Sequence, residues 1–529
     1  MTRINGTAMT RINETTMTRI NGMRVWGSGM CRAACRRVNV SLVAALVAAA
    51  CAAPRASVRP APQSAVAELR RVVDSMVADP HFRSAHFGIL VVDPDRGDTL
   101  YSHNAGKLFM PASNQKILTG AIALHLLGPS YRWVTTVAAS GPIENGVLRG
   151  DLVVVGTGDP SVSDHMSGDA MAPLRAMADS LVARGVHRVT GSLVKGGDAF
   201  PDAALGFGWS WDDLDFAYSA GVDELTFNEG FSRVVVRGAS EVGATPTAST
   251  RPARTVPGVR VWARTVAAGA TVRRGANAIR ARQDSSDAWT VIVEGDITTG
   301  DSAVLTITHR DPGGVYLRAL YEALTEKGIE LEGRVSPRWS PPTYPLFSVQ
   351  SPPLGEILPR FEKPSQNQIG EILLKTLGRA KTGVGSADSG ARVMRDQLMA
   401  WGAASDGFVV RDGSGLSRHN VVTPETIVRV LASIRSDSAF RVFYDALPIA
   451  GVDGTIASRM RNSPAQGNVH AKTGTLDMVR SLSGYVTTAD RRLLIFSVLV
   501  NNWTVPVREV ERVQDALATL LARFRMDDR

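Results

Sequence analysis

The spacing of apolar and polar residues changes along this chain and divides it into regions of different predicted structure. Residues 64–76 carry apolar side chains at helical spacing, which predicts an amphipathic helix. The run Phe87–Asp93, followed by a turn and a second strand over Asp98–Ser102, predicts a β-hairpin. A strongly apolar helix is expected over Ser113–Leu127, where a Gly-Pro pair ends it. This part of the chain therefore mixes helix with antiparallel strand.

The pattern changes between about residues 134 and 340, where short β-type runs alternate with glycine-rich turns. The clearest of these runs are Leu152–Val155, Arg233–Arg237, Thr290–Glu294 and Ala303–Thr308. Short strands separated by turns are typical of small β domains. We therefore expect a mostly β insertion here, built as two small subdomains.

Helical spacing returns after a proline-rich stretch at 337–353, and the chain then ends with strands and a last helix. The predicted elements are helices within 354–377, 391–401 and 424–434, strands around Gly484 and over 493–500, and a helix over 507–525. The domain organisation that follows has four segments. They are an N-terminal extension with an export signal (1–53), a catalytic domain in two parts (54–137 and 341–529), and the inserted β subdomains (138–340).

The first fifty residues have the features of a secretory signal. Two arginines, Arg36 and Arg37, precede the apolar run Val38–Ala50, which is followed by small residues and is too short to span a bilayer. We therefore expect export to the periplasm or cell envelope. Ala48–Cys51 resembles a lipoprotein processing site, so Cys51 is a candidate for a lipidated membrane tether. Cleavage by an ordinary signal peptidase is the alternative.

Composition narrows the function classes. The net charge of +9 is concentrated in residues 1–50, which hold +6, so the remainder is nearly neutral and nucleic-acid binding loses its main support. The three cysteines, Cys31, Cys35 and Cys51, all lie near the N-terminus, which excludes a disulfide framework in the body of the chain. Since no His/Asp/Glu cluster has metal-ligand spacing either, we expect neither a metal nor a cofactor.

One candidate catalytic pair is Ser113 and Lys116, at the start of the predicted apolar helix. Residues three apart are neighbours on one helix face, so Lys116 can reach the Ser113 hydroxyl. A second Ser-x-x-Lys, Ser192 to Lys195, lies in a strand-like run, where such positions point to opposite faces. The chain has only eight lysines against 51 arginines. A lysine can act as a neutral base, whereas arginine keeps its proton.

A Lys-Thr-Gly run at Lys472, Thr473 and Gly474 precedes an apolar strand and is predicted to lie on an edge strand, where Gly474 allows a close backbone approach. A second such run begins at Lys381. It follows a helix end by a few residues and continues into a glycine-rich loop without strand flanks, so we favour Lys472.

Two further segments leave alternatives open. Ser365 and Asn367 form a Ser-x-Asn run between the other two motifs, and by themselves they could equally be a helix-capping turn. The polar loop Asp412–Asn420 could border a cleft or could be a simple turn.

The three runs occur in the order Ser-x-x-Lys, Ser-x-Asn, Lys-Thr-Gly, which is the signature of penicillin-recognising serine acyltransferases. From about residue 62 to the C-terminus the chain resembles the D-alanyl-D-alanine carboxypeptidase/endopeptidases of the low-molecular-mass class C penicillin-binding proteins. The segments that carry the resemblance are 109–116, 152–160, 208–213, the loop after Asp412, and 470–484. One departure is Gln366, where that group commonly has Asp.

The resemblance implies the fold and the reaction. The fold would be α/β (α+β): a transpeptidase-like domain with an antiparallel sheet flanked by helices, a helical subdomain and a mostly β insertion. The 252 residues from Ser113 to Ser365 are more than compact β-lactamases have, and they leave room for that insertion. The implied reaction is cleavage between the D-alanines of peptidoglycan stem peptides, with β-lactams as covalent inhibitors. Alternatives are a serine β-lactamase-like hydrolase and a non-catalytic cell-wall-binding protein.

The resemblance also implies a role for each residue. Ser113 would be the nucleophile, Lys116 its base, and Ser365 the proton donor to the departing amine. The residues expected to bind substrate or the oxyanion are Asn367 for the acyl-side amide, Lys472 and Thr473 for the terminal carboxylate, and the N–H groups of Ser113 and Thr475 beside Gly474.

Overall fold

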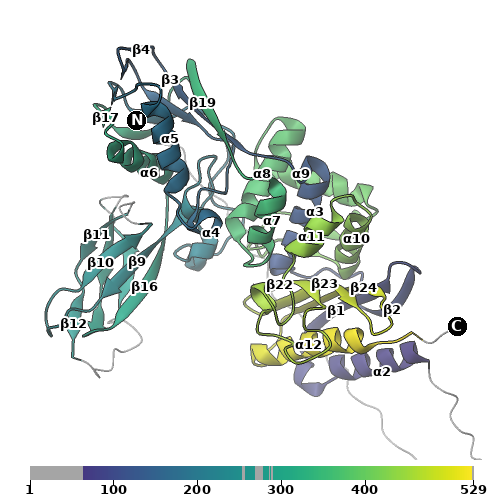
Figure 1. Ribbon diagram of the computed structural model, residues 1–529. Helices are drawn as coiled ribbons and strands as arrows, with labels where there is room; N and C mark the ends of the chain where they lie inside the picture. Colours follow the sequence, from purple (N-terminus) through teal and green to yellow (C-terminus); the bar gives the residue numbers. More distant parts are fainter. Residues whose placement is uncertain (1–63, 253–256, 268–277, 285, 287–289, 527–529) are drawn as a thin grey trace, which may run out of the picture. The chain divides into compact units, whose positions relative to one another are not determined.

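A five-stranded antiparallel sheet joins the two ends of the described part of the chain (Figure 1). Its strands, in spatial order, are β2 (Asp98–His103), β1 (His86–Asp93), β24 (Leu493–Asn501), β23 (Val479–Thr487) and β22 (His470–Leu476). The computed structural model describes residues 64–252, 257–267, 278–284, 286 and 290–526, which belong to one compact unit. The predicted export signal, with Cys51, lies outside the described residues.

One face of this sheet is covered by the first and last helices, α2 (Ala65–Val77) and α12 (Val507–Arg523). Their apolar stripes are buried against the strands in one core, which contains Leu69, Val73 and Leu517. The described part of the chain thus begins and ends on the same layer. In the part of the chain that the structure describes, none of the helices combines the length and apolar character needed to cross a membrane.

The opposite face of the sheet packs on a helical subdomain with its own large apolar core. Its helices are α3 (Gln115–Leu127), α7 (Leu354–Glu362), α8 (Asn367–Thr382), α9 (Ala387–Ala400), α10 (Pro424–Arg435) and α11 (Phe440–Ala446). Helix α3 is buried from Gln115 through Leu124, so it forms the centre of this subdomain. It is preceded by a 3₁₀ turn over Ala112–Asn114.

The helical pattern expected within residues 354–377 forms two helices, α7 and α8. Pro364 lies between them and has no backbone N–H to continue the helical hydrogen bonds. Ser365 follows with a φ of +65°, in the left-handed region, which turns the chain sharply. This turn places the Ser-x-Asn run at the start of α8. The expectation for Lys381 also needs correction, since it lies in the last turn of α8, which Gly383 ends, and not in a loop.

Among the described residues, the region predicted as a mostly β insertion contains two large apolar cores and a small apolar cluster of Ala138, Val153 and Val194. The first lies between a five-stranded sheet and the helices α5 (Ala172–Val182) and α6 (Pro312–Glu326), which the strand pattern did not indicate. This sheet has the order β18 (Val335–Trp339), β8 (Leu193–Lys195), β6 (Leu152–Val155), β3 (Val134–Ala139), β19 (Tyr344–Gln350). A small sheet beside it has the order β17 (Glu330–Leu331), β7 (Arg188–Val189), β5 (Val147–Leu148), β4 (Ile143–Glu144).

The second core is enclosed by three small sheets. Their strands are β10 (Thr247–Arg251), β9 (Phe231–Arg237) and β16 (Ser302–Thr308); β11 (Gly258–Val261), β14 (Thr290–Glu294) and β13 (Arg280–Gln283); and β12 (Arg264–Val266) with β15 (Asp296–Thr298). A further pair, β20 (Phe408–Val409) with β21 (Val421–Val422), brackets the Asp412 loop. The boundaries of the predicted domains stay a prediction.

Candidate active site

The three predicted motifs meet where α3 passes the edge strand β22. Ser113 lies in the 3₁₀ turn before α3, and Lys116 is in the first turn of that helix. The distance between Lys116 Nζ and Ser113 Oγ is 3.0 Å. The i, i+3 spacing therefore brings the amine to the hydroxyl as the sequence predicted. The Ser192–Lys195 run does not form such a pair: the Lys195 amine contacts Asp223, 2.8 Å away.

The amine of Lys116 is fully buried and is held by two further groups. It donates to Asn367 Oδ1 at 2.6 Å and to the carbonyl of Ser414 at 2.7 Å. Burial, with a smaller effect from the charge of Lys472, lowers the pKa of Lys116 to about 7. A large share of this lysine is therefore neutral at neutral pH, although three oxygen atoms surround it.

The second lysine, Lys472, lies on β22 and is also fully buried. Its amine donates to Ser365 Oγ at 2.8 Å and to the carbonyl of Thr473 at 3.0 Å. Burial lowers the pKa of Lys472, while the nearby carboxyl of Glu362 acts in the opposite direction. The Ser-x-Asn and Lys-Thr-Gly runs, predicted separately, are thus joined by one hydrogen bond.

The edge strand approaches the nucleophile's turn closely because Gly474 has no side chain. A Cβ at this position would lie 2.5 Å from the carbonyl oxygen of Pro111. Asn114 fixes the same approach by donating to the carbonyl of Lys472 at 2.7 Å. Thr473 Oγ1 donates to Thr455 Oγ1 at 2.7 Å, and Thr475 is exposed at the end of the strand.

The Asp412 loop, left open by the sequence, borders this site, since it supplies the Ser414 carbonyl to Lys116. Asp412 holds the loop's shape by accepting from the N–H groups of Gly415 and Ser417. Glu371 of α8 accepts from the N–H of Ser414 at 2.9 Å. Burial, together with the charge of Asp412, raises the pKa of Glu371.

Several site residues were missed from the sequence. Asn367 Nδ2 donates to the carbonyl of Tyr218, 149 positions away along the chain, so a backbone group of the inserted region completes the site. Glu362, at the end of α7, is buried near both lysines, and burial raises its pKa. The role of a backbone carbonyl cannot be recognised from a sequence, because every residue has one. A single glutamate near a helix end forms no recognisable motif either. The Ser113–Lys116 pair was predictable because local spacing alone aligns it.

An antiparallel sheet with a Lys-Thr-Gly edge strand beside a helix that starts with Ser-x-x-Lys is the fold of penicillin-binding proteins. The crystal structure of penicillin binding protein 4 (DacB) from Haemophilus influenzae superposes with a TM-score of 0.73 at 23% sequence identity, covering 85% of this chain and 99% of that one. The predicted fold class is thereby confirmed.

The chain belongs to the D-Ala-D-Ala carboxypeptidase 3 (S13) family, whose family model matches residues 69–524. It is 34% identical over 483 residues to a D-alanyl-D-alanine carboxypeptidase of Actinomadura sp. (strain R39), covering 86% of this chain and 85% of that protein. It is also 25% identical to the D-alanyl-D-alanine carboxypeptidase DacB of Haemophilus influenzae, covering 79% and 86% of the two chains. The prediction of a serine-type D-Ala-D-Ala carboxypeptidase is thereby confirmed.

Proposed function

We propose that this carboxypeptidase cleaves peptidoglycan stem peptides through an ester at Ser113, with Lys116 as the base. The observation that supports this most strongly is the 3.0 Å distance between Ser113 Oγ and a fully buried lysine amine. A general base within hydrogen-bonding distance and with a pKa near the working pH removes a proton efficiently. The neutral Lys116 amine takes the hydroxyl proton as Ser113 attacks the carbonyl between the two D-alanines.

The negative charge that develops on the carbonyl oxygen is stabilised by the backbone N–H groups of Ser113 and Thr475. The first belongs to the N-terminal turn before α3, where the helix dipole also favours negative charge. The second lies at the exposed end of β22, beside the glycine that allows the strand to approach. Each donor of this kind contributes about 3–4 kcal/mol to catalysis.

The departing amine receives its proton through Ser365, whose hydroxyl is hydrogen-bonded to the Lys472 ammonium. Lys472 and Thr473 bind the terminal carboxylate of the substrate. Asn367 is assigned to the acyl-side amide, and its own amide now bridges Lys116 and the Tyr218 carbonyl. Binding the substrate would therefore exchange the Tyr218 contact for a substrate contact, while the contact to Lys116 remains. Water then hydrolyses the ester and restores Ser113.

The test of this assignment is covalent labelling with a fluorescent penicillin, since β-lactams acylate the nucleophile of such a site. We expect the unmodified protein to be labelled and Ser113→Ala to remain unlabelled. Ser192→Ala, the serine of the second Ser-x-x-Lys run, is the matched control and should label normally. Labelling that persists in Ser113→Ala would contradict the assignment.

A second matched pair tests the carboxylate anchor. Lys472→Ala is expected to lose acylation by roughly 100-fold or more, because it removes a buried cation from the site. Lys381→Ala changes the exposed lysine of the other Lys-Thr-Gly run and should label like the parent. Equal labelling of the two variants would remove Lys472 from the site.

We further propose that the protein is exported to the cell envelope, either free in the periplasm or tethered by a lipid on Cys51. The apolar run Val38–Ala50 and the small residues before Cys51 support export. Mass determination of the N-terminal peptide of the mature protein distinguishes a diacylated Cys51 from a free N-terminus. A retained apolar run would contradict both forms.

A further inference from the structure

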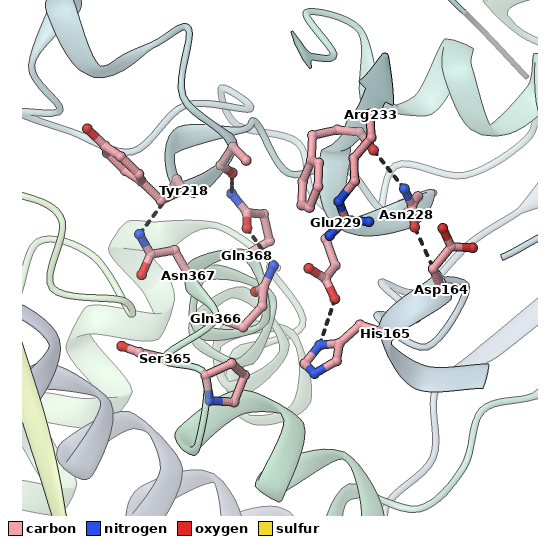
Figure 2. Close-up of a pocket in the computed structure, with 13 residues that line it drawn as sticks. Asp164, His165, Tyr218, Asn228, Glu229, Arg233, Ser365, Gln366, Asn367 and Gln368 are labelled. Atoms are coloured by element: carbon pink, nitrogen blue, oxygen red, sulfur yellow. Dashed lines mark hydrogen bonds and ion pairs between the residues drawn. The ribbon is translucent and has the colours of Figure 1, made fainter. Parts of the chain in front are cut away.

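One of the three oxygens around the Lys116 amine belongs to a peptide group and not to a side chain. This is the carbonyl of Ser414, which accepts from Lys116 Nζ at 2.7 Å. The other two are the Ser113 hydroxyl and the amide oxygen of Asn367. The amide nitrogen of Asn367 is held from its other side by the Tyr218 carbonyl (Figure 2). A peptide oxygen cannot turn away by side-chain rotation, so whatever fixes this peptide group also fixes the amine.

The N–H of the same peptide group donates to a carboxyl group. The bond between Ser414 and Gly415 has its carbonyl on the Lys116 amine, and its N–H donates to Asp412 Oδ1 at 2.8 Å. Hydrogen bonds in such a chain polarise one another, so a negative charge at the N–H makes the carbonyl oxygen more negative. From Asp412 Oδ1 to Lys116 Nζ the path crosses one peptide group and two hydrogen bonds, roughly 8 Å at most.

The carboxyl group of Asp412 is buried and is surrounded by donors. Its Oδ1 also accepts from Asn420 Nδ2 at 2.6 Å. Its Oδ2 accepts from the N–H of Ser417 at 2.6 Å and from Trp209 Nε1 at 3.0 Å. With the N–H of Gly415, four donors point at two oxygens. This set matches an ionised carboxyl group, which only accepts hydrogen bonds.

The loop reaches the amine because Gly415 packs directly on the turn that carries Ser113. Gly415 has a φ of +87°, in the region that favours glycine. A Cβ at this position would collide with the carbonyl oxygen of Ala112, the residue before Ser113. The place of the peptide group is therefore set by backbone contact as well as by its hydrogen bond to Asp412.

The preceding peptide group of the loop provides a comparison within the same structure. The N–H of Ser414 donates to Glu371 Oε1 at 2.9 Å. The carbonyl of that peptide group, on Gly413, accepts from the Thr119 hydroxyl at 2.8 Å. Glu371 is thus a second buried carboxyl group in contact with the loop, but its path ends on a hydroxyl and not on the Lys116 amine.

We propose that Asp412 is a positioning residue for the acyl transfer and acts on Lys116 through the peptide group between them. Asp412 fixes that peptide group and makes its oxygen more negative, and the oxygen holds the amine at the Ser113 hydroxyl. The inference rests on the proposed function, in which Lys116 removes the proton of Ser113. As Ser113 Oγ attacks, its proton moves to Lys116 Nζ and the amine becomes an ammonium. A more negative oxygen stabilises that ammonium, so the transfer becomes more favourable.

The effect of Asp412 on Lys116 has to be separated from that of other charged groups. Among the described residues, the charged side chains that face the amine are Glu362 from α7, Glu371 from α8, Lys472 from β22 and Asp412 itself. Burial is the largest cause of the lowered pKa of Lys116, and the charge of Lys472 adds to it, whereas the three carboxyl groups act in the opposite direction. Removal of the Asp412 charge should therefore lower the pKa of Lys116 further.

The test is the rate of acylation by a fluorescent penicillin between pH 5 and pH 9, measured on the full-length parent and on four variants. Asp412→Asn removes the charge. The midpoint of its rising limb should move to lower pH by about one unit or more, the effect of a charge roughly 8 Å away in a protein interior. Its highest rate should fall by about tenfold or more, because the amine is a weaker base and is held less well. Asp412→Ser, whose hydroxyl can still accept the Gly415 N–H, is a second neutral variant and should shift the midpoint in the same direction.

Two variants serve as matched controls. Trp209→Phe removes one donor to Asp412 and keeps the charge, so the midpoint should stay at the value of the parent. Glu371→Gln alters the neighbouring carboxyl group, whose path ends at Thr119. Its midpoint should move by less than half of the shift in Asp412→Asn. Circular dichroism of each variant reports whether the fold is kept.

An unmoved midpoint in both neutral Asp412 variants would overturn the proposal. Equal shifts in Asp412→Asn and Glu371→Gln would also overturn it, because the effect would then come from net charge and not from the peptide path. So would loss of the fold in both neutral variants, since Asp412 would then serve the structure alone. A parent without a rising limb, or labelling that persists in Ser113→Ala, would instead contradict the proposed function, so the two failures are distinguishable.

Discussion

Acylation of Ser113 should become faster with rising pH along a limb centred near pH 7. The reason is that only the neutral amine of Lys116 can take the serine's proton. Burial lowers the pKa of this amine to about 7 from the ordinary value of 10.5. At pH 7 about half of such lysines are neutral, whereas an ordinary lysine is neutral in only about one molecule in 3,000. Burial of Lys116 therefore raises the amount of active base by about three orders of magnitude.

The alkaline side of the same profile should fall. Lys472 must be an ammonium to bind a carboxylate, and burial lowers its pKa as well. Because its cation is lost as the pH rises through this lowered pKa, the carboxylate anchor weakens there. The two lysines together predict a bell-shaped dependence of acylation on pH, with Lys116 responsible for the rising limb.

The assay is the second-order rate of acylation by a fluorescent penicillin between pH 5 and pH 9, with circular dichroism at each pH to check the fold. Lys116→Arg should lose the rising limb and most of the rate, about 100- to 10,000-fold, because arginine does not deprotonate. Lys381→Arg changes an exposed lysine and should keep the parent profile. A rate that stays constant down to pH 5, or a rising limb centred near pH 10, would refute the role of Lys116.

Three other substitutions test the surroundings of the site. Glu362→Gln removes the buried carboxylate that raises the pKa of Lys472. The falling limb of the pH profile should therefore move to lower pH. A limb that does not move would contradict the effect of Glu362 on Lys472. Gly474→Ala should lower acylation by at least tenfold, because its Cβ would lie 2.5 Å from the Pro111 carbonyl and push β22 away from Ser113; full activity would show that the strand need not approach so closely. Trp133→Ala should reduce the free energy of unfolding, measured by urea denaturation, by about 3–5 kcal/mol. The reason is that the ring is fully buried and its N–H donates to Thr376. A loss below about 1 kcal/mol would be inconsistent with this packing.

The parts of the site that sequence predicts are those set by local geometry. Ser113 and Lys116 are three positions apart at a helix start, and Lys472 lies on an apolar strand that a glycine allows to pack closely. The remaining parts depend on tertiary packing. The Ser414 carbonyl reaches Lys116 from 298 positions away, and the Tyr218 carbonyl reaches Asn367 from another subdomain. Every residue has such a carbonyl, so no pattern of side chains distinguishes these two.

The fold, like the site, was predictable where local sequence patterns determine it and not where tertiary packing does. Strands of the central sheet were predictable from their apolar runs, because both faces of that sheet are buried against helices. The start of α8 lies at the Ser-x-Asn run, where the sequence allowed a helix-capping turn, and Pro364, which has no backbone N–H, is a local signal for the break before it. Helices α5 and α6 were missed because the β-type runs around them dominate the composition of that region. The apolar stripe of α5 is nonetheless buried in the core between these helices and the sheet.

The most direct test of the central claim is mass spectrometry of the full-length protein after reaction with penicillin G, followed by peptide mapping. We predict one covalent adduct with the mass of the intact penicillin, located on the peptide that contains Ser113. An adduct on another serine, such as Ser192, would contradict the account. So would rapid turnover of penicillin that leaves the protein unmodified.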